Sequence, residues 1–238
     1  MLRLIVPVLL MLSSCASARE LPSPRQAAAG AKAAAPPVSR KVGGQVLTSD
    51  DAPPVRIEFD KSFKYVGGQS FILYDVASAE QHFFVDADSG GRIRRLYWVQ
   101  FEAYLPNNGH AYDYKSPNVV SLGGLDFIAD SAARHIPAPA AGQAGQPENK
   151  ISDGDRARAF LASKGFTPAS GEVLWQRLVH MADESRRSEL MIIYLEDLGG
   201  AGLTAADLSP GGRASARWEE TAKALLERAR KGLTVTRR

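Results

Sequence analysis

The 238-residue sequence contains a single cysteine, Cys15, close to its N-terminus. The chain therefore has no internal disulfide, although disulfides are common in exported proteins. Everything after Cys15 also lacks a thiol, which excludes cysteine nucleophiles and cysteine-rich metal sites there. We therefore expect the fold to be held together by its hydrophobic core alone.

The sequence also lacks an apolar run long enough to span a bilayer as a helix, which takes about 20 residues. The run at residues 4–12 is shorter and contains Pro7. A basic start, here Arg3, followed by an apolar stretch of about 7–15 residues is typical of a secretory signal. The pattern predicts export, so any membrane attachment depends on this terminus.

The end of this run has one aliphatic residue, two small residues and the cysteine, in the order Leu12, Ser13, Ser14, Cys15. It resembles the lipobox of bacterial lipoprotein precursors. The resemblance implies a signal peptide at residues 1–14, cleavage before Cys15, and lipidation of Cys15 with acyl chains such as palmitate. Two or more acyl chains anchor a protein stably, whereas one chain binds only marginally. Ala16 after the cysteine implies delivery to the outer membrane, with the domain facing the periplasm.

A second cleavage pattern competes with the first. Ala16, Ser17 and Ala18 form an A-x-A site, at which an ordinary signal peptidase would release a soluble periplasmic or secreted protein. The short apolar core and the position of the sole cysteine favour lipidation over this alternative.

Few aromatic residues occur before residue 55, and runs of Ala and Pro dominate. Such a composition buries too little apolar surface to offset the entropy of ordering the chain. We therefore predict a disordered tether over residues 15–54, in which Val46 and Leu47 weakly indicate a strand. A single domain over residues 55–238 follows, with a flexible Ala-, Pro- and Gly-rich insert near residues 137–150.

The domain alternates apolar and polar residues in segments separated by Gly, Asp and Asn, which is typical of antiparallel strands. The predicted strands are 55–59, 69–76, 81–87, 92–105, 119–128, 172–181 and 189–196. Helical spacing predicts a helix that is capped by Ser152 and ends at Gly165, and a longer one over residues 214–231. The fold class is α+β: a curved antiparallel sheet of six to seven strands packed on a long C-terminal helix, with a shorter mid-chain helix.

Alternation along the strands at 69–105 separates two faces of the predicted sheet. The face that we expect in the core carries Phe71, Leu73, Phe83, Val85, Tyr97, Val99 and Phe101. The other face mixes aromatic and titratable side chains: Ile72, Tyr74, His82, Phe84, Asp86, Arg94, Trp98, Gln100, Glu102 and Tyr104.

The mixture on the second face is typical of the lining of a pocket or interface. We take as candidate ligand- or partner-binding residues Tyr74, His82, Phe84, Arg94, Trp98, Gln100 and Tyr104. The alternative is a cross-strand ladder in which Trp98 and Phe84 pack while Arg94 pairs with Asp86 at the surface.

A polar, aromatic loop follows the strand at 92–105, and loops on rigid scaffolds often carry function. Within it, His110 and Asp113, together with Glu102, form a candidate acid/base group. The four histidines show no metal-binding spacing, and Asp86 and Asp88 lack the downstream glutamate of a calcium loop.

These patterns favour a non-enzymatic envelope protein that binds a small ligand or an envelope partner. The alternatives are a hydrolase or lyase that uses His110, Glu102 and Asp113, and a structural envelope factor without a pocket. We expect no cofactor and no metal. The net charge of +3 is spread along the sequence, so we expect no nucleic-acid partner but some affinity for anionic lipid.

Overall fold

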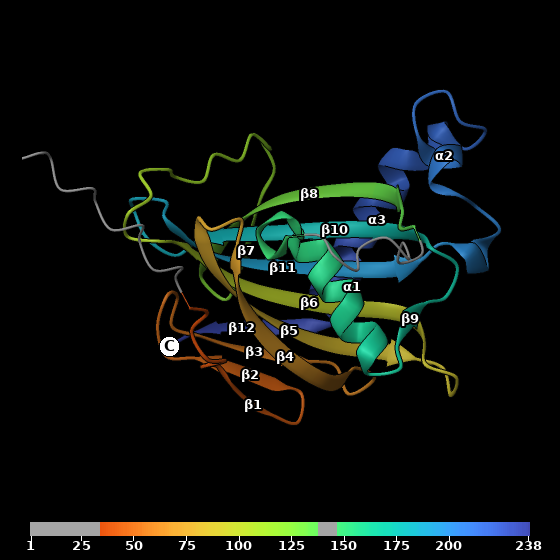
Figure 1. The fold of residues 1–238 in the computed structure, drawn as a ribbon. Helices are drawn as coiled ribbons and strands as arrows, with labels where there is room; N and C mark the ends of the chain where they lie inside the picture. Colours follow the sequence, from red (N-terminus) through yellow and green to blue (C-terminus); the bar gives the residue numbers. More distant parts are fainter. Residues whose placement is uncertain (1–33, 138–146) are drawn as a thin grey trace, which may run out of the picture. The chain divides into compact units, whose positions relative to one another are not determined.

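The computed structural model describes residues 34–137 and 147–238, which form an α+β domain (Figure 1). Cys15, the predicted signal peptide and most of the predicted insert lie outside these residues. Among the described residues, no helix is both long and apolar enough to cross a bilayer.

The larger sheet has a continuous antiparallel path in the order β4-β5-β6-β11-β10-β8-β7. Its strands are β4 (Lys64–Leu73), β5 (Ala77–Ala87), β6 (Arg92–Tyr104), β7 (Val119–Leu122), β8 (Leu125–His135), β10 (Glu172–Met181) and β11 (Ser188–Asp197). A two-residue strand, β9 (Thr167–Pro168), pairs with the start of β6 in parallel. Six of the seven predicted strands correspond to this path, with the predicted strand at 119–128 split into the β7–β8 hairpin at Gly123 and Gly124. The seventh, at 55–59, lies in the smaller sheet.

A second, four-stranded sheet contains both ends of the described chain. Its order is β1 (Lys41–Gly43), β2 (Val46–Ser49), β3 (Val55–Phe59) and β12 (Leu233–Arg237). The predicted disordered tether is therefore wrong from Lys41 onward. Polar and small residues around β1 and β2 hide the strand signal, but Leu47 is fully buried and β2 pairs with β3. β12 is likewise a strand that the sequence pattern did not predict.

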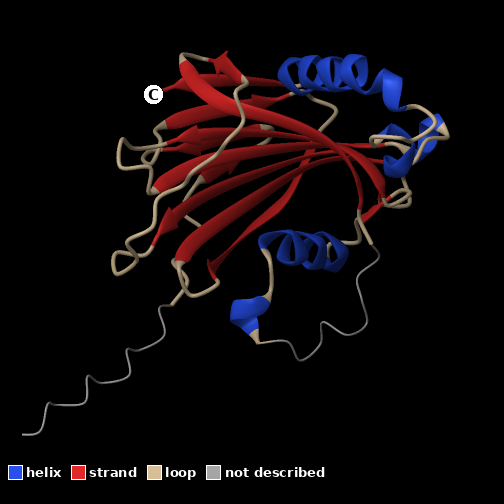
Figure 2. Ribbon diagram, turned by 90° about the horizontal axis from the view of Figure 1, so that it is seen from above, coloured by secondary structure: helices blue, strands red, loops and turns tan. Residues whose placement is uncertain are grey.

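Two helices cover opposite faces of the larger sheet (Figure 2). They are α1 (Asp153–Ser163) and α3 (Trp218–Lys231), and short helical turns lie at η1 (Glu148–Lys150), η2 (Gly199–Ala201), α2 (Ala205–Leu208) and η3 (Ser215–Arg217). Both predicted helices are confirmed, although α3 begins four residues later than expected. Gly232 ends α3 as predicted, at a point where a Cβ atom would lie 2.3 Å from the Tyr97 hydroxyl oxygen.

The two helices define two hydrophobic cores on the two faces of one sheet. The α3-side core contains Phe84, Tyr97 and Val99 from the larger sheet, together with Leu225 of α3 and residues of the small sheet. The α1-side core contains Phe83, Val85 and Trp98, together with Ala157 and Leu161 of α1. Because both faces are covered, apolar residues occur on both sides of these strands, and their sequence pattern does not show which side faces which core.

The predicted division of the β5 and β6 side chains into two faces is wrong. In the observed register Phe83 pairs with Trp98, and Phe84 pairs with Tyr97. Directly paired residues share a face, so Phe83 belongs with Trp98, and Phe84 belongs with Tyr97. The predicted faces grouped Phe83 with Tyr97, which is one residue away from the observed pairing, and a displacement of one residue exchanges the two faces of a strand.

Candidate functional site

Four of the predicted binding residues do lie on the α1 face of the sheet. Trp98, Gln100 and Tyr104 alternate along β6 on that face, and Arg94 precedes them. Trp98 and Gln100 are buried, whereas Arg94 is exposed. Arg94 donates to Asp86 over 2.7 Å, which is the surface pairing that the ladder alternative predicts.

His82 and Phe84 lie on the opposite face, so they do not form one surface with Trp98. His82 is fully buried, with Nδ1 3.1 Å from the Tyr65 hydroxyl and Nε2 2.8 Å from a Glu80 oxygen. Phe84 stacks on Phe59 at 3.9 Å between ring centroids.

Glu80 connects this cluster to the N-terminal segment. Burial raises the pKa of Glu80, but hydrogen bonds from His82 and from the backbone of Arg40 and Ser39 outweigh that effect and lower it to about 2. The ionised carboxylate thus attaches residues 39 and 40 to the sheet. Tyr74, the remaining predicted binding residue, is 45% exposed in the β4–β5 turn.

The residues of the predicted acid/base group have separate partners. Glu102 accepts hydrogen bonds from Tyr112 over 2.9 Å and from Gln100 over 2.6 Å. Asp113 is exposed and pairs with Lys115. His110 is exposed beside the Tyr104 ring, and no interaction joins it to either carboxylate in the described part of the chain. The hydrolase or lyase alternative therefore lacks the convergence that it requires.

Glu102 instead belongs to a polar row that crosses the α1 face. Side-chain amides connect Gln69 to Gln81 over 2.8 Å and Gln81 to Gln100 over 2.7 Å, and Gln100 in turn donates to Glu102. Next to Glu102, its direct cross-strand partner Glu189 is 2% exposed. The row ends under the loop that carries Tyr112 and Tyr114.

Glu189 is a buried carboxyl group that the sequence pattern did not predict. Burial and the neighbouring Glu102 raise the pKa of Glu189 to about 8, against hydrogen bonds from Tyr114 and the nearby Arg177. Burial also raises the pKa of Glu102. Two adjacent carboxyl groups with few compensating cations hold a proton readily at neutral pH. In the sequence, Glu189 looked like the first residue of a strand that follows a polar turn.

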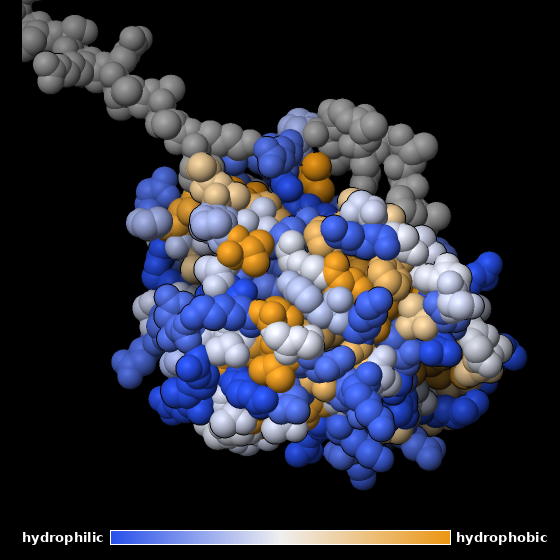
Figure 3. Space-filling model, turned by 90° about the horizontal axis from the view of Figure 1, so that it is seen from below, coloured by the Kyte–Doolittle hydropathy of each residue, from blue (hydrophilic) through white to orange (hydrophobic). Residues whose placement is uncertain are grey.

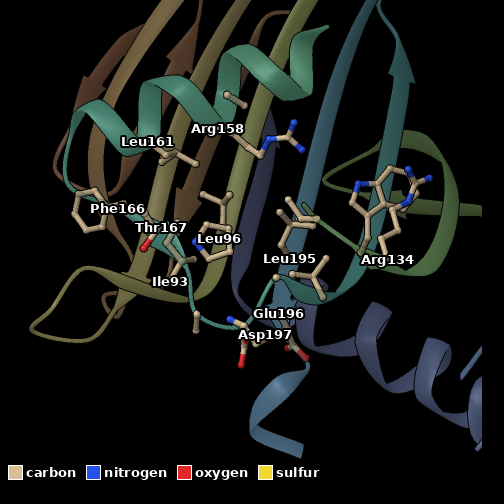
Figure 4. A pocket seen from close by; sticks show the side chains of 18 of the residues that line it. Ile93, Leu96, Arg134, Arg158, Leu161, Phe166, Thr167, Leu195, Glu196 and Asp197 are labelled. Atoms are coloured by element: carbon tan, nitrogen blue, oxygen red, sulfur yellow. Dashed lines mark hydrogen bonds between the residues drawn. The ribbon is translucent and has the colours of Figure 1, made fainter. Parts of the chain in front are cut away.

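A groove of about 800 Å³ lies on the same face, between α1 and the strands (Figure 4). It is lined by the start of β6 and the end of β11, whereas the carboxyl pair lies at the other end of these two strands. We call it the α1 groove. Leu96, Trp98, Val173, Trp175 and Leu195 line it from the strands. Its other walls are Ala157, Leu161 and Ala162 of α1 and the segment Phe166–Gly171. Of the predicted binding residues, only Arg94 and Trp98 line the groove.

Trp98, which lines the groove, has an unsatisfied donor. Its indole is 8% exposed, and the buried Nε1–H has no hydrogen-bond partner among the described residues. A buried donor without a partner is costly, and such groups are rare in folded proteins.

Three arginines line the groove, and they differ in how they are engaged. Arg94 pairs with Asp86, and Arg158 of α1 pairs with Asp155. Arg134 of β8 stacks on Trp175 at 4.2 Å from the ring centroid and has no ion pair with a described residue. Arg134 was not a predicted binding residue, because it lies near the predicted insert, where no strand was expected.

Comparison with protein-family models, curated proteins and solved structures finds no match to this chain.

No group of three or more His, Cys, Asp or Glu side chains that could hold a metal ion occurs in residues 34–137 and 147–238. The face shown in Figure 3 is mostly hydrophilic, with hydrophobic residues in small, scattered patches. Among the described large hydrophobic side chains, the exposed ones are Val38, Tyr74 and Val119. The α1 groove is therefore the best-formed candidate binding site in the described residues.

Proposed function

We propose that this chain is an exported envelope protein, anchored through Cys15, that binds a small ligand with an apolar body in the α1 groove without transforming it. The observation that carries the proposal is the groove itself, whose volume of about 800 Å³ is typical of small-molecule sites. Its floor of aliphatic and indole side chains suits an apolar ligand.

Trp98 supports the same proposal, because this large aromatic residue lines the groove and adds apolar surface to it. Trp98 was a candidate on sequence grounds, but its neighbours in the proposed site come from β10, β8 and α1 rather than from β5. A structural factor that uses no pocket has no need of these features.

Titration of the full chain with the neutral fluorescent dye N-phenylnaphthylamine tests this proposal. We expect saturable binding to the parent protein. Ala162→Trp, at an exposed position of α1, and Leu195→Trp, on the floor, fill the groove and weaken dye binding by about tenfold or more.

Val119→Trp is the matched control, because Val119 is 59% exposed on β7 and does not line the groove. It should leave dye binding unchanged. Binding that survives both groove substitutions, or that is absent from the folded parent protein, would rule out the proposed function.

Anchoring is tested separately by expressing Cys15→Ser in a bacterial host and fractionating the membranes. The parent chain should remain with the membrane fraction, because its acyl chains hold it there. The substituted chain should become soluble. If both chains fractionate alike, lipidation at Cys15 is not what determines their location.

A further inference from the structure

Charge is distributed unevenly around the α1 groove. In Figure 4, Glu196 and Asp197 lie together at one end, while Arg158 extends from α1 toward the side where Arg134 lies. Glu196 is already occupied, because Arg228 binds it through two contacts of 2.7 Å. Asp197 likewise accepts from the Ser170 hydroxyl over 2.6 Å. Arg228 therefore neutralises Glu196, whereas the Ser170 hydroxyl satisfies Asp197 without removing its charge.

The arginine side of the groove is less completely paired. The Arg134 guanidinium has its face on Trp175, which fixes its orientation, but its N–H donors have no described carboxylate or carbonyl to bind. A second guanidinium, Arg177, lies 5.2 Å from the centre of the same ring. Arg177 is held by Asp130 over 2.8 Å, so Arg134 is the cation with free donors.

Arg158 faces Arg134 across the groove and is 26% exposed. Its partner Asp155 also caps the start of α1 with Ser152, so the pair is part of the helix terminus. A guanidinium has five donors and can keep one carboxylate while binding another. Arg134 and Arg158 therefore provide cationic donors from two sides of an otherwise apolar groove.

We propose that the ligand of the α1 groove is an amphipathic anion, with an aliphatic chain on the Leu96, Trp175 and Leu195 floor and a carboxylate or phosphate head on Arg134, opposite Arg158. This inference rests on the proposed function and specifies its ligand. Planar guanidinium donors match the oxygens of both head groups. The positions of Arg134 and Arg158 fix the direction, and the Asp197 carboxylate, which has no cationic partner among the described residues, repels an anionic head from the other end.

Displacement of N-phenylnaphthylamine from the full chain by matched amphiphiles tests the ligand class. Dodecanoate and dodecyl phosphate should compete about tenfold more strongly than dodecanol, and dodecyltrimethylammonium more weakly than dodecanol. Acetate and inorganic phosphate lack the chain and should not displace the dye. Comparison of the two anions shows which head group the arginines prefer.

Arg134→Gln should remove the advantage of the anions while leaving dodecanol competition intact, and Arg134→Lys should restore part of it. Arg134 is exposed, so these substitutions do not disturb a core. Arg237→Gln removes an exposed arginine of β12 in the other sheet and is the matched control. It should change nothing.

The outcomes separate the two proposals. If dodecanol competes as well as dodecanoate, the anionic class is overturned while the groove function stands. If the preference for anions survives Arg134→Gln, the head group does not bind Arg134 and the assignment fails. If the dye itself does not bind, the proposed function fails first.

Discussion

At the scale of single residues, Glu102 and Glu189 are adjacent carboxyl groups whose pKa values are both raised by burial. Tyr114 donates to both oxygens of Glu189, at 2.9 and 2.8 Å, and Tyr112 donates to Glu102. These hydrogen bonds satisfy the carboxyl groups but do not neutralise them. Arg177 is the cation that lowers the pKa of Glu189, and Glu102 and Asp153 oppose it. Because Tyr112 and Tyr114 donate to this pair, the protonation state of the two carboxyl groups affects how the loop that carries the tyrosines is held.

We predict that the free energy of unfolding falls as the pH rises from about 4.5 to about 8. Over this range the folded chain keeps a proton on Glu189, whose pKa is raised from 4.5 to about 8, while the unfolded chain loses it. The group thus stabilises the fold fully below its unfolded pKa, and this stabilisation is lost as the pH passes its folded pKa. Urea unfolding at about pH 5 and about pH 8.5 should differ by on the order of 3 kcal/mol.

Glu189→Gln should flatten this dependence, because an amide keeps a similar shape and does not ionise. Glu58→Gln is the control, since Glu58 is exposed on β3 and paired with Arg56. An unchanged pH dependence in Glu189→Gln would show that other groups cause it.

The sequence identified Trp98 and Arg94 as binding candidates but could not assign their neighbours. Glu189, Arg134 and Trp175 come from strands that are distant in the sequence, and only the β11–β10–β8 pairing brings them to the α1 face. Alternation within one strand carries no information about that pairing. His82 was misplaced for a related reason. Both faces of this sheet are covered, so a polar side chain such as His82 can be buried on either face when it has a buried hydrogen-bond partner. Its polarity therefore does not show which face it occupies.

At the scale of elements, α1 is both a core helix and a wall of the groove. Ala157 and Leu161 are buried against the sheet, while Ala162 and Arg158 line the groove. The Ser152 hydroxyl accepts from the Asp155 backbone N–H over 3.0 Å at its first turn. Stability at this terminus therefore also determines how firmly the groove is formed.

We predict that Ser152→Ala lowers the free energy of unfolding by about 1 kcal/mol, because it removes an N-cap acceptor. Ser163→Ala, at the other end of α1, should have a smaller effect, since the Ser163 hydroxyl is exposed and bonds a carbonyl in its own turn. Chemical denaturation of the three proteins measures the difference. Equal losses in both variants would contradict a specific role for the cap.

Elements with strong local signals were predicted well. β10 matches the expected range of 172–181, and α1 has the expected cap and end. β12 was missed because Leu233 and Val235 are just two apolar residues in a short segment after a helix. Its strand conformation depends on pairing with β3, which is distant in the sequence.

At the scale of the whole molecule, one sheet is shared by two cores. Tyr97 and Val99 face α3, while Trp98, which lies between them on β6, faces α1. The same strands therefore support both cores, and unfolding of the sheet would disrupt both. The fold class was predictable because amphipathic strands and helices have few ways to bury their apolar faces. The α3-side core was not fully predictable, because it includes residues of the small sheet, whose strands β1 and β12 were not predicted.

We predict that both cores unfold in one transition. Trp218→Phe leaves Trp98 and Trp175 to report on the α1 side, whereas the double variant Trp98→Phe and Trp175→Phe leaves Trp218 beside the α3-side core. In each variant, the midpoint from tryptophan fluorescence should coincide with that from circular dichroism. Separate midpoints would show that the two faces unfold independently.

The small sheet also has a consequence for the order of events during synthesis. β3 has β12 as one of its two neighbours, and the Arg238 backbone N–H binds the Pro54 carbonyl over 3.1 Å. A growing chain therefore cannot complete this layer before residues 233–238 have left the ribosome, and Val55, Ile57 and Phe59 lack β12 until then. For a chain that is exported as we propose, this late completion of the small sheet keeps part of the chain unfolded during synthesis, which favours its passage through a narrow export channel.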